Sequence, residues 1–243
     1  MVTFSLGMTV GMRKEGRKTY QYCTQAVANL RGVGFIEPLH LFVEPDATGH
    51  VPNEQTYDVY PHRNKKNRGC FRNFAHGLTW LTRFAPADWY FMIQDDCLWR
   101  DDAYKLMQQT CNDPQYADVG FLSPYTSKSM VPFGKVKGKA KKGLAPTGWV
   151  QHKFHNKAFW GAVCMVFPRQ TAMELLAFPR FVKHRHHRKL DVVLGNCMRD
   201  MEKRGLVHVP SICEHIGQFS TLGRHRIRGN KWGRKGFGFT EKV

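Results

Sequence analysis

The stretch that decides the fold is DWYFMIQDDCLW, residues 88–99. Eight of its twelve residues are apolar or aromatic, which is typical of a strand that enters a core. Two adjacent carboxylates, Asp95 and Asp96, stand near its end. Like charges repel, and carboxylates lose hydration when they are partly buried. A divalent cation such as Mg²⁺ or Mn²⁺ would relieve both costs. An acidic pair also opens many turns and helices, so the spacing alone leaves metal binding and N-capping open.

Strands and helices alternate on both sides of this stretch. Apolar residues at helical spacing between residues 70 and 85 predict a helix immediately before it. This alternation predicts an α/β fold, a single domain with a mostly parallel sheet flanked by helices. Ligand sites in such sheets lie at the carboxyl ends of the strands, where Asp95 and Asp96 fall. Other strands are expected at 2–10, 38–45, 56–63, 119–125, 158–168 and 206–217, and other helices at 18–32, 101–111, 169–178 and 190–205. Thr19 is a candidate N-cap and the basic segment 134–148 a candidate mobile loop.

The charge of the chain indicates anionic partners. Its 243 residues carry 37 Lys and Arg against 19 Asp and Glu, a net charge of +18. Nucleic acid is the first candidate, followed by a membrane surface and phosphorylated small molecules. Three basic runs, 128–157, 180–189 and 224–235, are interleaved with aromatic residues that could stack on bases. Such runs are more often solvated surface. The residues expected to contact nucleic acid are Lys135, Lys137, Lys139, Lys141, Lys142, Arg185, Arg188, Arg224, Arg226, Arg228 and Trp232.

Other features bear on the compartment. No apolar run approaches the roughly 20 residues that cross a bilayer, and no basic residue precedes the apolar stretch at the N-terminus. The seven cysteines are dispersed without a CxxC pair. A reduced, cytoplasmic protein is therefore expected (in the host cytoplasm if the chain is viral), without a zinc site built from cysteines.

Two further residues could take part in chemistry. His215 follows an apolar strand, where a histidine most often has only a structural role. Asp191 stands at an expected helix start, where N-capping is the simpler interpretation and a general base the alternative. The histidines of 184–187 are flanked by Lys183, Arg188 and Lys189, so phosphate contact is expected there rather than metal binding.

Four segments in order resemble glycosyltransferases of the GT-A fold. They are GMTVGMRK at 7–14, YFMIQDDCLW at 90–99, FWGAVCMVFPRQTAMELL at 159–176, and KLDVVLGNCM at 189–198 followed by VPSICEHIGQFSTLG at 209–223. The pattern is similar to that of the N-glycan-branching N-acetylglucosaminyltransferases of type IV, which carry a P-S-x-x-x-H-x-G stretch near their termini. One departure is Gln94, which stands where those enzymes usually have an acid.

The resemblance implies a role for each matched residue. Asp96 and His215 would hold Mn²⁺ or Mg²⁺ against the diphosphate of a UDP-sugar. Asp191 would accept a proton from the acceptor hydroxyl, with inversion at the anomeric carbon. The donor would also be contacted by Thr9, Arg13, Gln94 and Asp95. The implied organisation is a glycosyltransferase domain at 1–223 (nucleotide-sugar half 1–125, basic loop 126–157, acceptor half 158–223) and a basic tail at 224–243.

Three functional hypotheses follow. The first is transfer of a sugar, glucose by preference, from a UDP-sugar to nucleic acid, with a 5-hydroxymethylpyrimidine of DNA as acceptor, as in viral genome modification. The second keeps the enzyme but replaces the acceptor with a glycan, a protein or a cell-envelope polymer. The third is a non-enzymatic basic module that binds nucleic acid. The second and third predict, respectively, a weak salt dependence of acceptor binding and no effect of removing the acidic residues.

Overall fold

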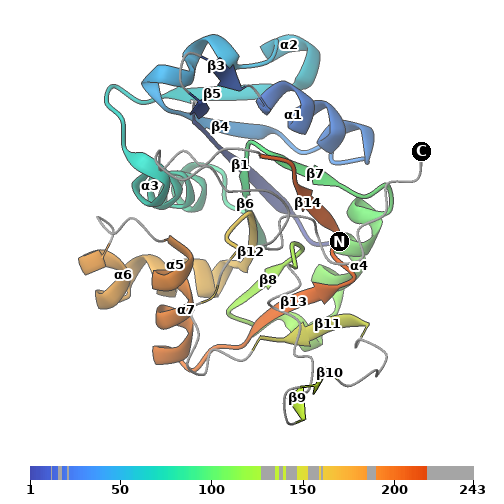
Figure 1. The fold of residues 1–243 in the computed structure, drawn as a ribbon. Coiled ribbons are helices and arrows are strands. Elements are labelled where there is room, and N and C mark those ends of the chain that lie inside the picture. The colour runs from blue at the N-terminus through green and yellow to red at the C-terminus, as the bar shows by residue number, and fades with distance from the viewer. Residues whose placement is uncertain are drawn as a thin grey trace.

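The computed structural model describes residues 1–11, 13–15, 18–20, 22–126, 135–136, 139–140, 147–152, 159, 161–184 and 190–217. Within these residues, one eight-stranded sheet organises the chain (Figure 1). Six of its strands run parallel, and β11 and β12 run antiparallel to their neighbours. The expected α/β fold with a mostly parallel sheet is therefore confirmed. The strand order is β11 (Gly148–Gln151), β13 (Gly205–Val209), β8 (Phe121–Ser123), β12 (Cys164–Pro168), β6 (Trp89–Gln94), β1 (Phe4–Val10), β4 (Leu39–Val43) and β5 (Val59–Arg63).

One face of the sheet is covered by α3 (Gly69–Phe84), which packs on β1 and β6, and by α5 (Arg169–Ala177). Two glycines allow α3 to approach closely. A Cβ atom on Gly77 would lie 2.7 Å from Cδ2 of Phe42, and one on Gly7 would lie 2.8 Å from Cδ1 of Leu81. Real Cβ atoms do not come this close, so a side chain at either position would have to displace the neighbour it meets.

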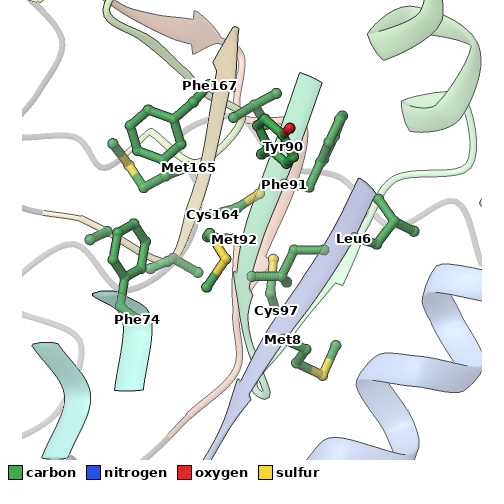
Figure 2. Packing of buried hydrophobic residues seen from close by; sticks show 14 of the residues in the cluster. Leu6, Met8, Phe74, Tyr90, Phe91, Met92, Cys97, Cys164, Met165 and Phe167 are labelled. Atoms are coloured by element: carbon green, nitrogen blue, oxygen red, sulfur yellow. The ribbon is translucent and has the colours of Figure 1, made fainter. Parts of the chain in front are cut away.

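The opposite face packs against α1 (Cys23–Gly32), α4 (Ala103–Asn112) and the short strand β7 (Cys97–Trp99). The ring of Tyr104 lies 6.3 Å from that of Phe4 and 5.0 Å from that of Phe35, centroid to centroid. Asn29 of α1 donates to the carbonyl of Trp99. Figure 2 shows the side chains of β1, β6 and β12 packed together at the centre of the sheet. This buried β6 explains the apolar run before the acidic pair.

The remaining α-helices of the described residues are α2 (Glu54–Tyr57), α6 (Pro179–His184) and α7 (Leu190–Asp200), and η1 (Pro45–His50) and η2 (Pro114–Tyr116) are short 3₁₀ helices. The described helices include none with the length and hydrophobicity that a membrane span needs.

Four local predictions were wrong. The strand expected from residue 56 begins at Val59, because Thr56 and Tyr57 belong to α2. The helix expected from residue 18 begins at Cys23, because β3 (Lys18–Tyr20) pairs with β2 (Arg13–Glu15), and Thr19 therefore lies in a strand instead of capping a helix. The predicted loop 134–148 contains a two-stranded ladder, β9 (Lys135–Val136) with β10 (Lys139–Ala140). The last predicted helix stops at Asp200, because the chain must reverse through Glu202 (φ 55°) to enter β13.

A pair of histidines makes the stability of the β4–β5 edge depend on pH. Nδ1 of His40 lies 3.2 Å from Nε2 of His62, and Trp80 packs on both rings. Burial, with a smaller contribution from His62, lowers the pKa of His40 to about 4, and burial lowers the pKa of His62. Asp58 acts in the opposite sense on His40. The unfolded chain therefore binds protons more readily than the folded one, and stability is lost as pH falls from about 6.5 towards 4.

We therefore expect His40→Gln to flatten the pH dependence of the unfolding free energy. Because His40 is only half-buried, solvent screening reduces its contribution, and the parent should lose about 1 kcal/mol more than the variant between about pH 7.5 and pH 5. Urea titrations of both proteins at the two pH values measure this difference. Equal losses in the two proteins would show that the histidine pair does not titrate on unfolding.

Candidate active site at the carboxyl edge of the sheet

Asp95 joins the end of β6 to the loop that follows β1. Its backbone N–H donates to the carbonyl of Thr9 over 3.2 Å, and its Oδ2 accepts from the N–H of Gly11 over 3.1 Å. Its side chain is almost fully buried, with a relative exposure of 4%. The carboxylate therefore fixes the backbone at the start of the β1 loop, at the edge where parallel strands expose ligand sites.

Asp96 and His215 meet although they lie far apart in the sequence. Nε2 of His215 is 2.5 Å from Oδ2 of Asp96, whose side chain is fully buried. The contact results from strand pairing, because β14 (Cys213–His215) runs antiparallel to β7 and sets His215 opposite Cys97. The N–H of Ile216 also donates to the carbonyl of Asp96, over 2.9 Å. A charge-assisted contact of this kind is the usual way to keep a carboxylate buried.

The turn between β13 and β14 carries His215 to this position. The N–H of Ile212 donates to the carbonyl of Pro124 over 2.9 Å. The N–H of Thr126 donates to Oγ of Ser211 over 3.0 Å. The segment Pro124–Thr126 after β8 therefore holds the serine-containing turn in place. The P-S-x-x-x-H pattern thus has a local structural meaning, since its serine fixes the turn and its histidine reaches Asp96.

Thr9 and Gln94 lie opposite each other in the β1–β6 register. Oγ1 of Thr9 donates to the carbonyl of Ile93 over 3.4 Å, and Nε2 of Gln94 donates to the carbonyl of Ala162 over 2.8 Å. Both side chains are partly buried beside the acidic pair. Gln94 therefore links β6 to the segment that enters β12. For Arg13 the structure describes only the backbone, in β2.

Asp191 lies in the first turn of α7, where its Oδ1 accepts from the N–H of Val192 over 2.9 Å. The other end of α7 leads into β13 at the amino edge of the sheet. The helix start that carries Asp191 is therefore directed towards the carboxyl edge. The structure brings Asp96 and His215 into contact, and Asp191 lies on a separate element.

The residues expected to contact nucleic acid lie mostly outside the described part of the chain. Lys135 is placed on β9 and Lys139 on β10, through their backbone only. The others fall outside the described residues: Lys137, Lys141, Lys142, Arg185, Arg188, Arg224, Arg226, Arg228 and Trp232.

Sequence reasoning missed Glu44 and Arg68, which meet at the same edge. Glu44 follows β4 and is buried, with a relative exposure of 5%. Its Oε2 accepts from the N–H of Arg68 over 2.8 Å, and Nε of Arg68 donates to Oδ1 of Asn64 over 2.8 Å. Burial is the main cause that raises the pKa of Glu44. The available signal was an acid directly after a buried strand, the same pattern that marked Asp95.

A second missed residue is Tyr125, which follows β8. Its ring centroid lies 6.4 Å from that of His215 in an edge-on arrangement, and its relative exposure is 4%. Burial raises its pKa, with smaller contributions from Cys213, Glu214, Cys97 and Asp96. Tyr125 therefore packs edge-on against His215 as a protonated phenol.

The donor set fits only one kind of metal site. Among the described residues, no group of three or more His, Cys, Asp and Glu could hold an ion by itself. The carboxylate of Asp96 and the imidazole of His215 together supply two ligands. Mg²⁺ usually keeps several waters and binds through one or two carboxylates plus substrate phosphates, and carboxylate and imidazole ligands also occur at Mn²⁺ sites. The residues present therefore fit a metal that the substrate helps to hold.

Comparisons with known proteins agree with this architecture. No protein-family model matches the chain, and no curated protein matches it. Among solved structures, the mannose-1-phosphate geranyltransferase from Thermus thermophilus superposes with a TM-score of 0.53 at 12% identity, over 91% of this chain and 80% of that one. GalNAc-T7, solved with UDP, GalNAc and Mn²⁺, superposes with a TM-score of 0.59 at 10% identity, over 96% of this chain. The chain spans about half of GalNAc-T7, 47% of its length. At such identities the likeness concerns the fold, and this chain has a GT-A-like fold.

Proposed function

We propose that this chain is a metal-dependent, inverting glycosyltransferase that moves glucose from UDP-glucose to a 5-hydroxymethylpyrimidine of DNA. The observation that carries the proposal is the contact between Asp96 and His215 at the carboxyl edge of a GT-A-like sheet. A buried carboxylate beside an imidazole at this edge is suited to a divalent ion that is shared with a diphosphate. The net charge of +18 supports a nucleic acid as acceptor.

The donor would occupy the space over the ends of β1, β4 and β6. Asp95 would hold the β1 loop against the nucleotide through the N–H of Gly11. Glu44 and Arg68 would recognise the edge of the base, since uracil presents an N–H donor next to carbonyl acceptors. GalNAc-T7, which shares the fold, was solved with UDP, GalNAc and Mn²⁺. The donor proposed for this chain is of the same chemical class.

The transfer itself would require one base and one charge stabiliser. Asp191 would take the proton of the acceptor hydroxyl while its oxygen attacks the anomeric carbon and the bond to the diphosphate oxygen breaks. A bound divalent metal would stabilise the charge that develops on the leaving diphosphate. Asp96 and His215 would hold that metal ion, and Tyr125 would exclude water from their contact.

Thermal unfolding in the presence of nucleotide-sugars, with and without Mn²⁺, tests the donor. A ligand present at 100 times its Kd adds about 2.7 kcal/mol, which raises the Tm of a chain of this size by roughly 5–10 °C. We expect this shift for UDP-glucose with Mn²⁺ and little shift without the metal. No shift with any UDP-sugar, together with pyrophosphate release from a nucleoside triphosphate and a sugar phosphate, would instead indicate a nucleotidyltransferase.

Transfer of labelled glucose into hydroxymethylated duplex DNA tests the acceptor. Label that stays covalently attached to the DNA, and is not released as free glucose, supports the proposal. Label that appears only in glycan, protein or cell-envelope acceptors, with acceptor binding that hardly responds to salt, would keep the enzyme and change its substrate.

A further inference from the structure

A basic ridge lies beside the candidate site, within the described residues. We define it as the exposed cations Lys65, Lys66 and Arg72, which belong to the segment RNKKNRGCFR at 63–72. This segment has five cations and no acid, and it leads from the end of β5 into the first turn of α3. It is separate from the three basic runs that the sequence pattern associated with nucleic acid.

The backbone under the ridge is held in one conformation. Asn64 is buried and donates through Nδ2 to Oδ1 of Asn73 over 2.9 Å, and its N–H donates to the carbonyl of Val43. Oδ1 of Asn67 accepts from the N–H of Gly69, whose φ is +72°. The asparagines therefore fasten the loop from within while the lysines between them remain exposed. Cations on a fixed backbone lose less conformational entropy on binding than cations on a mobile one.

The ridge cations are not neutralised by acids of the described chain. Arg63 forms an ion pair with Glu54, whereas no ion pair with a described residue involves Lys65, Lys66 or Arg72. Next to the first turn of α3 lies α6, since the rings of Phe71 and Phe181 are 5.1 Å apart. A further cation, Lys183, lies in the last turn of α6.

Acidic residues collect at the opposite edge of the sheet. They stand just before the strands, where they face away from the candidate site. Five of them lie within three residues of a strand start: Glu37, Asp58, Asp88, Asp118 and Glu202. By contrast, the segment 63–72 that starts at the end of β5 has no acidic residue.

We infer that the ridge formed by Lys65, Lys66 and Arg72 binds the sugar–phosphate backbone of a nucleic acid and directs it to the carboxyl edge. The inference rests on the proposed nucleic-acid acceptor and identifies the surface that holds it. Phosphates spaced along a strand match several cations along one loop, and each contact releases counterions. The ridge contributes affinity and position, whereas the sugar donor is held by other residues.

The test is a triple variant, Lys65→Gln, Lys66→Gln and Arg72→Gln. A control variant with the same change in net charge, Arg83→Gln, Lys105→Gln and Arg169→Gln, removes exposed cations elsewhere. Binding of a fluorescent DNA duplex is measured as a function of salt for both variants and the parent. We expect the log–log salt slope of the ridge variant to be shallower by about two to three and its affinity at low salt to fall at least about tenfold. The control should keep a slope close to that of the parent.

Several outcomes would overturn the inference. Equal slopes for the ridge variant and the parent would show that these cations do not contact phosphate. A second such outcome is that none of the three proteins binds DNA, while the ridge variant loses binding to anionic vesicles or to a sulfated polysaccharide. The ridge would then bind another polyanion. The rise in Tm with UDP-glucose and Mn²⁺ distinguishes a failure of the ridge inference from a failure of the proposed function. The ridge variant should show the same rise as the parent. If the parent itself shows no rise, the result counts against the proposed function and not against the ridge.

Discussion

Asp96→Asn is expected to abolish the Mn²⁺-dependent stabilisation by UDP-glucose and to lower transfer at least about 1,000-fold, which corresponds to roughly 4 kcal/mol of transition-state stabilisation. The amide keeps the shape of the side chain but removes the negative charge that a metal ion requires. Because Asp96 is fully buried and contacts Nε2 of His215, no neighbouring exposed carboxylate can replace it without moving β7 and β14.

Two measurements separate this effect from a loss of folding. The metal-free Tm of Asp96→Asn should stay within a few degrees of the parent, because the amide can still hydrogen-bond to His215. Asp118→Asn is the matched control, since its carboxylate is exposed at the amino edge and pairs only with Arg204 among the described residues. A variant at Asp96 that keeps the full Mn²⁺-dependent shift would exclude this residue as a metal ligand. It would also favour the non-enzymatic alternative if transfer were absent in the parent.

The part of the site that lies on β6 could be predicted from local sequence. An apolar run followed by Gln94, Asp95 and Asp96 specifies a buried strand and its end, because burial and strand termination are both local properties. The contact between Asp96 and His215 could not be derived in this way. It depends on the antiparallel pairing of β14 with β7 and on the turn held by Ser211, which are long-range. Only the resemblance to GT-A enzymes indicated it.

The contact between Glu44 and Arg68 also could not be predicted from local sequence. Glu44 carries the local signal of an acid after a buried strand, but its contact with Arg68 depends on β4 and β5 lying next to each other in the sheet. Thr19 shows how local signals can also mislead. A threonine before an apolar helix is a good N-cap candidate, but β3 pairs antiparallel with β2 and places Thr19 in a strand. Secondary structure was therefore predictable where burial dominates, and less so at the edge where the chain reverses.

Asp191→Asn should separate catalysis from donor binding. If Asp191 is the general base, the amide cannot accept the proton of the acceptor hydroxyl, and turnover should fall by about 10²–10⁴-fold. The UDP-glucose and Mn²⁺ shift in Tm should remain, since Asp96 and His215 are on other elements. This split distinguishes Asp191→Asn from Asp96→Asn, which should lose both turnover and the shift.

Asp200→Asn is the control for Asp191→Asn because it changes the same side chain at the other end of α7. Asp200 pairs with Arg180 and Arg199 near the amino edge, so its replacement should cost stability of about 1 kcal/mol or less and leave turnover unchanged. Single-turnover transfer at saturating donor measures the chemical step for all three proteins. If Asp191→Asn turned over within tenfold of the parent, another group would have to be the base, or the anomeric configuration would be retained. The anomeric configuration of the product decides between these two cases. An inverted product points to another base beside the acceptor oxygen, whereas with retention the acceptor proton would pass to the leaving diphosphate or to a different group.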